Sequence, residues 1–136
     1  MKFLLDTSIV SAPALKEPNT KVVRKLQQQG ASCAIAAPVW HELVFGAGRL
    51  PAGKRRAALE EYLQTVVRRS FPILPYDEAA ADWHGRERAR LEEQGRPVPF
   101  VDGQIAAIAF TRSLTLVTAN GKDFCPFDGL EVVDWT

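Results

Sequence analysis

The chain lacks the features that mark zinc-cluster, disulfide-rich, secreted and membrane proteins. Its two cysteines, Cys33 and Cys125, match no metal-ligand spacing, and we expect both to be free thiols, with Cys33 in a core strand. No apolar run approaches the length of a membrane-spanning helix. Lys2 is followed by only three apolar residues before Asp6, which is too short a run for a signal peptide. We therefore expect a cytoplasmic protein with no membrane partner.

An excess of either charge is also missing. The formal net charge is +1, with 24% charged and 46% hydrophobic residues, which is ordinary for a globular protein. This balance argues against general electrostatic capture of nucleic acid, so a polyanion would have to be held by a local basic patch or by metal. The length suits a single domain over residues 1–136, and no internal repeat is visible.

What the chain does contain is a regular alternation of strands and helices. Apolar runs predict strands at residues 3–5, 32–36, 72–76, 115–118 and 131–133. Helical periodicity and capping residues predict helices at residues 7–12, 20–29, 38–50, 54–70, 77–94 and 101–112. Such alternation is typical of an α/β domain whose mainly parallel sheet carries helices on both faces.

The first predicted strand leads directly to an acid. Residues 3–5 are apolar without alternation, as expected of a strand that is buried on both faces of a parallel sheet. Asp6 would then lie at the carboxyl end of a central strand, where open α/β sheets bind their ligands. Thr7 and Ser8 would form the turn or the N-cap of the following helix. The alternative is that Asp6 only caps that helix.

Two further acids fall on helix faces that should be apolar. On a helical wheel of residues 38–50 Glu42 falls between Gly46 and Phe45, within the buried arc that contains Val39 and Leu43. A buried carboxylate is costly unless it is paired, protonated or bound to metal, and a salt bridge to a core arginine is the alternative interpretation. Asp102 lies at the centre of the apolar arc of its own helix, in the first turn, where N-capping is the alternative.

A fourth acid, Asp123, follows the strand at 115–118 and an Asn120-Gly121 turn. By itself it is more typical of a loop or capping acid. Because Asp6 and this loop both follow parallel strands, however, both are expected at one end of the sheet. Oxygen donors that converge there, without cysteine or a suitable histidine, favour Mg²⁺ or Mn²⁺ over zinc.

The other charged residues favour less specific roles. His84 is expected on the solvated face of its helix. Two basic clusters are expected to be mainly solvated, with Arg88 and Glu92 as an i,i+4 pair. The clusters are Arg49, Lys54, Arg55 and Arg56, and Arg86, Arg88, Arg90 and Arg96. The cations at 54–56 oppose the helix dipole in a first turn, a cost that a phosphate backbone or an acidic partner would offset.

Four short stretches that carry these acids follow one another in a distinctive order. They are Phe3-Leu4-Leu5-Asp6-Thr7-Ser8, Glu42-Leu43, Phe100-Val101-Asp102-Gly103-Gln104-Ile105-Ala106 and Leu116-Val117-Thr118-Ala119-Asn120-Gly121-Lys122-Asp123-Phe124. Together they resemble the PIN-domain toxins of bacterial toxin–antitoxin pairs, the VapC-like ribonucleases. Gln94-Gly95-Arg96-Pro97 and Val133-Asp134-Trp135 also look like that family, so the resemblance covers essentially the whole chain.

The resemblance implies a PIN fold with a five-stranded, mainly parallel sheet and an acidic pocket that binds Mg²⁺ or Mn²⁺ and hydrolyses RNA. The matching acids are Asp6, Glu42, Asp102 and Asp123, with Thr7 and Asn120 as supporting polar groups. In the family the fourth acid stands at the place of either Asn120 or Asp123. Because the first is an amide here, Asp123 is favoured. Ala37 departs from the family, in which Ser or Thr often caps the helix.

The resemblance also implies partners. Proteins of this kind form homodimers, cleave tRNA, rRNA or mRNA, and are silenced by a small antitoxin whose C-terminal segment lies across the groove. The antitoxin's N-terminal part binds operator DNA, so contact with DNA would be indirect. The first two helices and the helix that bears Trp83 are candidate contact surfaces.

Two other classes of protein are alternatives. An acidic α/β pocket could simply dock a basic peptide, without turnover. An acid after the first strand also begins the haloacid-dehalogenase-like phosphatases, but those need a second acid two residues later, where this chain has Ser8.

Overall fold

The computed structural model describes residues 1–136, and at its centre lies the strand β1 (Phe3–Leu5). The sheet has five strands in the order β3-β2-β1-β4-β5, and every neighbouring pair is parallel. The other strands are β2 (Cys33–Ala36), β3 (Ile73–Leu74), β4 (Thr115–Val117) and β5 (Val132–Val133). The predicted α/β fold with a five-stranded parallel sheet is confirmed, and the sheet is parallel throughout.

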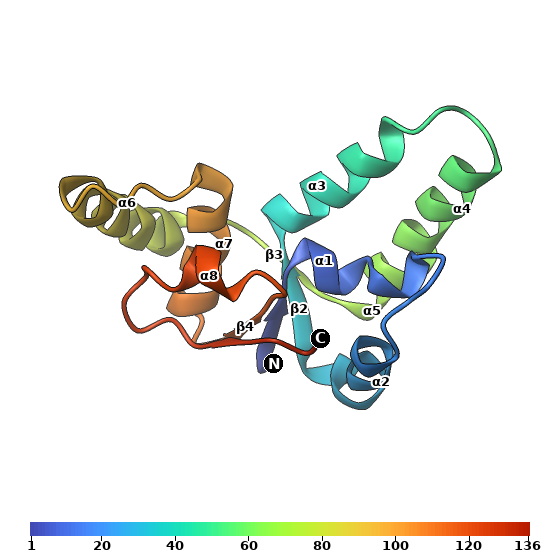
Figure 1. Ribbon diagram of the computed structural model, residues 1–136, viewed down its shortest axis with the longest axis horizontal. Helices are drawn as coiled ribbons and strands as arrows, with labels where there is room; N and C mark the ends of the chain where they lie inside the picture. The colour runs from blue at the N-terminus through green and yellow to red at the C-terminus, as the bar shows by residue number, and fades with distance from the viewer.

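Helices flank the strands on both sides (Figure 1). They are α1 (Thr7–Val10), α2 (Thr20–Gln29), α3 (Ala37–Gly48), α4 (Lys54–Tyr62), α5 (Arg68–Ser70), α6 (Glu78–Glu93), α7 (Phe100–Thr111) and α8 (Gly121–Phe124), with 3₁₀ turns at Ala12–Ala14 and Gly30–Ser32. In Figure 1, α6, α7 and α8 gather on one side of the strands and α1 to α5 on the other, while α3 and α4 form a hairpin that projects from the sheet. No helix combines the length and the apolar character that a membrane crossing requires.

The helical stretch predicted at residues 54–70 is present, but it changes character midway. A π-helical turn at Leu63–Val67 separates α4 from α5. Leu63 and Val67 are buried as expected. Regular helical periodicity over residues 54–70 predicts Val66 on the inward face with Leu59, Leu63 and Val67, but Val66 is 45% exposed, so that prediction is wrong. The wider π turn changes the angle between successive side chains, which a regular helical wheel cannot anticipate.

The helices α6 and α7 pack closely, and a glycine makes this possible. His84 of α6, expected on the surface, is only 3% exposed, so that expectation is also wrong. A Cβ atom at position 103 of α7 would lie 2.6 Å from Cδ2 of His84, so Gly103 leaves the space that the imidazole fills. The ring is fixed by a hydrogen bond of 2.8 Å between its Nδ1 and the hydroxyl of Tyr76. Burial lowers the pKa of His84, which keeps the ring neutral at pH 7.

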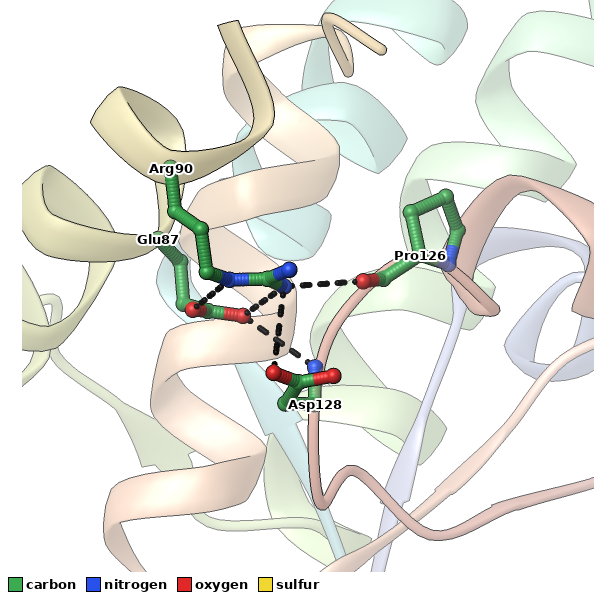
Figure 2. A network of polar contacts seen from close by, with 4 residues as sticks. All are labelled: Glu87, Arg90, Pro126 and Asp128. Atoms are coloured by element: carbon green, nitrogen blue, oxygen red, sulfur yellow. Dashed lines mark hydrogen bonds and ion pairs between the residues drawn. The ribbon is translucent and has the colours of Figure 1, made fainter. Parts of the chain in front are cut away.

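A polar network ties α6 to the segment that follows α8 (Figure 2). Arg90 donates from Nε and Nη2 to the carboxylate of Glu87 at 2.7 and 2.8 Å, and from Nη2 to the carbonyl of Pro126 at 3.0 Å. The backbone N–H of Asp128 donates to the same Glu87 carboxylate at 3.1 Å. These bonds lower the pKa of Glu87. They hold in place the chain segment that connects α8 to β5.

Candidate functional site

Asp6 lies where β1 ends and α1 begins, and both of its carboxylate oxygens accept hydrogen bonds. Oδ1 accepts from the backbone N–H of Thr7 at 2.8 Å, and Oδ2 accepts from the hydroxyl of Thr118 at 2.7 Å. The residue is 9% exposed. The capping interpretation and the strand-end interpretation are both correct, because Asp6 is the N-cap of α1 and stands at the carboxyl end of the central strand.

Thr118 belongs to this site, although the sequence indicated only that it ends a strand. Its side chain is fully buried, and its hydroxyl accepts from the backbone N–H of Asn120 at 3.0 Å while donating to Asp6. In the register of the sheet Leu5 lies beside Val117, so the next residues of the two parallel strands are also neighbours. The order and register of the strands would therefore have identified Thr118.

Glu42 lies on α3 and contacts the first turn of α1. The hydroxyl of Thr7 donates to Oε2 of Glu42 at 3.0 Å. Glu42 is exposed and forms no ion pair, so neither its predicted burial nor the alternative salt bridge is correct. The covered stripe of α3 is confined to Val39, Leu43 and Ala47, because α3 projects from the sheet as part of the hairpin (Figure 1). Glu42 lies outside these three residues on α3, so its carboxylate stays in contact with water.

Asp102 lies in the first turn of α7 and is half-buried. Its side chain accepts no hydrogen bond, and the N-cap of α7 is Pro99, so the capping alternative is wrong. The pKa of Asp102 is raised from 3.8 to about 6, first by burial and then by the negative charges of Asp6, Asp123 and Glu42. Three other carboxylates, at the end of β1, on α3 and on α8, therefore act on this one side chain.

Asp123 and Asn120 are both exposed, at and just before α8. The backbone N–H of Asp123 donates to the carbonyl of Asn120 at 3.0 Å, which closes the first turn of α8. Asn120 makes no side-chain hydrogen bond, and its contribution is the backbone N–H that it gives to Thr118. The carboxylate at 123 is the one in this loop whose charge reaches Asp102.

The four acids share one electrostatic environment without forming a tight cluster. No three His, Cys, Asp or Glu side chains stand close enough together to hold one ion. The donors themselves fit Mg²⁺ or Mn²⁺, because they are all carboxylate oxygens. Asp6 is fixed by two hydrogen bonds and Glu42 accepts one from Thr7, whereas the carboxylate of Asp123 is exposed and accepts none.

Comparison with known proteins relates nearly the whole chain to one family. The family model described as PIN domain matches residues 3–130. The chain is 35% identical over 136 residues to the tRNA(fMet)-specific endonuclease VapC of Shigella flexneri, covering 100% of this chain and 99% of that protein. It is 33% identical over 128 residues to toxin FitB of Neisseria gonorrhoeae, covering 92% of each.

Solved structures give the same picture. A chain of FitAB bound to an IR36 DNA fragment superposes with a TM-score of 0.90 at 30% identity, covering 98% of this chain and 96% of that chain. A chain of DNA-bound VapBC from Salmonella typhimurium gives a TM-score of 0.84 at 30% identity, covering 100% of this chain and 99% of that chain.

Proposed function

Because the chain belongs to the PIN-domain family, we propose that it is a Mg²⁺- or Mn²⁺-dependent endoribonuclease, the toxin of a toxin–antitoxin pair. The observation that carries the proposal is the environment of Asp102, a half-buried carboxyl group whose pKa three other carboxylates help to raise. Repulsion of this kind favours the binding of a divalent cation. The names of the relatives, which include an endonuclease for tRNA, support RNA as the substrate class.

Asp6, Asp102, Glu42 and Asp123 would hold the cation, and Thr7 and Asn120 would support them. Held there, a divalent ion would supply Lewis acidity toward a water molecule and positive charge to offset charge that develops on the phosphate. The chain's own part is orientation: Thr118 and the N–H of Thr7 fix Asp6, and the hydroxyl of Thr7 fixes one oxygen of Glu42.

Partners follow from the relatives in the same way. The solved neighbours are FitAB and VapBC complexes, some with DNA, so we propose a cognate antitoxin that carries the DNA contact. A cytoplasmic location and a homodimer are part of the proposal. The RNA target could be tRNA, rRNA or mRNA.

The test is cleavage of RNA by protein purified free of antitoxin, with Mg²⁺, with Mn²⁺ and with EDTA. We expect cleavage only with metal, and its loss in Asp6→Asn and Asp102→Asn. Asp82→Asn is the matched control, because this acid is exposed on α6 and pairs with Arg86. Cleavage that persists in EDTA, or in the double variant Asp6→Ala/Asp102→Ala, would contradict the proposal.

The spacing of the carboxylates favours one other candidate, a pocket that docks a basic peptide without turnover. No three of them stand close enough to share an ion. This candidate predicts peptide binding that is indifferent to metal, and no RNA cleavage at any protein concentration.

A further inference from the structure

The outer face of α2 carries a stripe of positive charge. Lys21, Arg24, Lys25 and Gln28 follow the spacing i, i+3, i+4, i+7, so they share one face of the helix. All four are exposed, and the helix contains no acid. The buried face of α2 points the other way, through Val22.

This stripe forms one wall of an open groove of about 620 Å³, which we call the α2 groove. The opposite wall is the segment 133–136, which in Figure 1 passes in front of the strands and ends beside α2. The floor is aromatic, because Trp135 packs edge-on against Phe3 at 5.1 Å between ring centroids. Lys2 does not line the groove, but its Nζ lies 5.5 Å from the centroid of the Phe3 ring in the floor.

The cations of the α2 groove are unpaired. None of the six salt bridges includes Lys2 or a residue of α2. The only acidic side chain that lines the groove is that of Asp134, and its Oδ1 accepts both the backbone N–H of Thr136 at 2.8 Å and the hydroxyl of the same residue.

The basic clusters that stood out in the sequence are different. Arg56 pairs with Glu60, and the expected pair of Arg88 with Glu92 is confirmed at 3.4 Å. Arg86 and Arg90 also have acidic partners. Ion pairs occupy three of the four arginines in the second cluster but only Arg56 in the first, so what distinguishes the α2 groove is that its unpaired cations line a groove with an aromatic floor.

The α2 groove is connected to the acidic site through the sheet. Phe3 in its floor is three residues before Asp6, a separation of about 10 Å along a strand that rises about 3.3 Å per residue. Val133 in its wall accepts the backbone N–H of Thr118 at 3.0 Å, and the hydroxyl of Thr118 donates to Asp6.

We propose that the α2 groove binds the sugar–phosphate backbone of single-stranded RNA next to the bond that is cleaved at the acidic site. This inference rests on the proposed ribonuclease function. Four acids repel an RNA strand until a cation is bound, so attraction has to come from elsewhere on the protein. Lysine and arginine contacts to phosphates are independent of sequence, and a charged groove with an aromatic floor is typical of single-strand binding.

The test separates binding from cleavage by using EDTA. Fluorescence anisotropy of labelled oligouridylate, measured over a range of salt concentrations, reports how many phosphates the protein neutralises. In single strands each phosphate contact contributes about 0.7 to the slope of log K against log salt, so Arg24→Gln/Lys25→Gln should reduce the slope by about 1.4. Adding Lys21→Gln should reduce it further.

Two matched variants control the measurement. Arg86→Gln/Arg112→Gln removes the same charge from the α6 and α7 side of the molecule and should leave the slope unchanged. Arg24→Lys/Lys25→Arg changes both side chains but keeps their charge, so it should bind oligouridylate like the unmodified protein. A reduced slope in the Gln variant alone is then an effect of charge and not of altering the helix.

The outcomes are distinct for the two proposals. If the slope of log K against log salt for Arg24→Gln/Lys25→Gln equals that of the control variant, the α2 groove does not bind RNA. This holds whether or not the protein cleaves RNA. The same measurement on labelled duplex DNA should show no such change. A slope that falls for duplex DNA and not for oligouridylate would also contradict the proposal. If the variant reduces the slope but the unmodified protein does not cleave RNA with Mg²⁺ or Mn²⁺, then RNA binding in the α2 groove is supported and the proposed ribonuclease activity is contradicted.

Discussion

Replacing Gly103 with alanine tests the packing that fixes the first turn of α7, next to Asp102. A Cβ atom there would lie 2.6 Å from Cδ2 and 2.9 Å from Cε1 of His84, and closer still to Nε2. The imidazole cannot simply swing away, because it is buried, bonded to Tyr76 at 2.8 Å, and covered by Phe100 at 4.9 Å between ring centroids.

The magnitude follows from two opposing effects. Overpacking a filled core costs about 1–3 kcal/mol, and here the upper end applies because the facing atoms belong to a fixed ring. Alanine also stabilises a helix interior by up to about 1 kcal/mol relative to glycine. We therefore expect Gly103→Ala to lower the free energy of unfolding by about 2 kcal/mol, which is a fall in Tm of roughly 8 °C at about 4 °C per kcal/mol.

The assay is thermal and urea unfolding alongside Gly85→Ala. Gly85 lies in the interior of α6, and a Cβ atom there meets nothing within 4 Å, so this control should gain up to about 1 kcal/mol. His84→Ala/Gly103→Ala should be less destabilised than the sum of its single variants, by about 0.5–3 kcal/mol. If Gly103→Ala gains stability as Gly85→Ala does, then His84 does not fill the space that Gly103 leaves, and the close packing of α6 on α7 is misjudged.

Three further predictions concern the charged groups. Asp102 has a raised pKa when folded, so its ionisation opposes folding as pH rises from about 4 to 6. Above pH 6 Asp102→Asn should be more stable than the unmodified chain by about 1–2 kcal/mol, because solvent screens part of the effect on a half-buried group, and the gap in urea titrations should close below about pH 4. Thr118→Val leaves one oxygen of Asp6 unpaired and should lower the free energy of unfolding, measured in urea titrations, by about 1–3 kcal/mol. Thr118→Ser keeps the hydroxyl and should retain most of the stability. Equal losses in the two variants would show that the hydroxyl is not what stabilises Asp6. Arg90→Met leaves Glu87 without its partner and should cost about 1–3 kcal/mol in the same measurement, and a loss below about 0.5 kcal/mol would mean that the network in Figure 2 contributes no more than a surface ion pair.

The central place of the first strand and the position of Asp6 could be predicted because they depend on local patterns. An unbroken apolar run is typical of a strand covered on both faces, and β1 is the middle strand of the sheet. The acid that follows such a run must then stand at the carboxyl end of the sheet. This inference needs no knowledge of any distant residue.

The errors arose where a residue's environment is supplied by another element. His84 is buried because Gly103 on the facing helix has no side chain, and Val66 is exposed because a π turn interrupts its helix. Glu42 is exposed because α3 extends beyond the sheet (Figure 1), which a helical wheel of α3 alone cannot show. Thr118 was missed because its partner, Asp6, is distant in sequence and adjacent only through the register of β1 and β4.

The four acids divide into a fixed pair and a free pair, and this division follows from how each is held. Asp6 is buried with both oxygens bonded, and Asp102 extends from α7, whose residues Ile105–Ala109 are all buried. Glu42 and Asp123 are exposed, on a projecting helix and on a four-residue helix. Changes to the fixed pair should therefore alter both stability and metal binding, since the core bears the repulsion between these two acids. Changes to Glu42 or Asp123 should alter metal binding with a smaller effect on stability, because water screens these exposed charges even though both add to the raised pKa of Asp102.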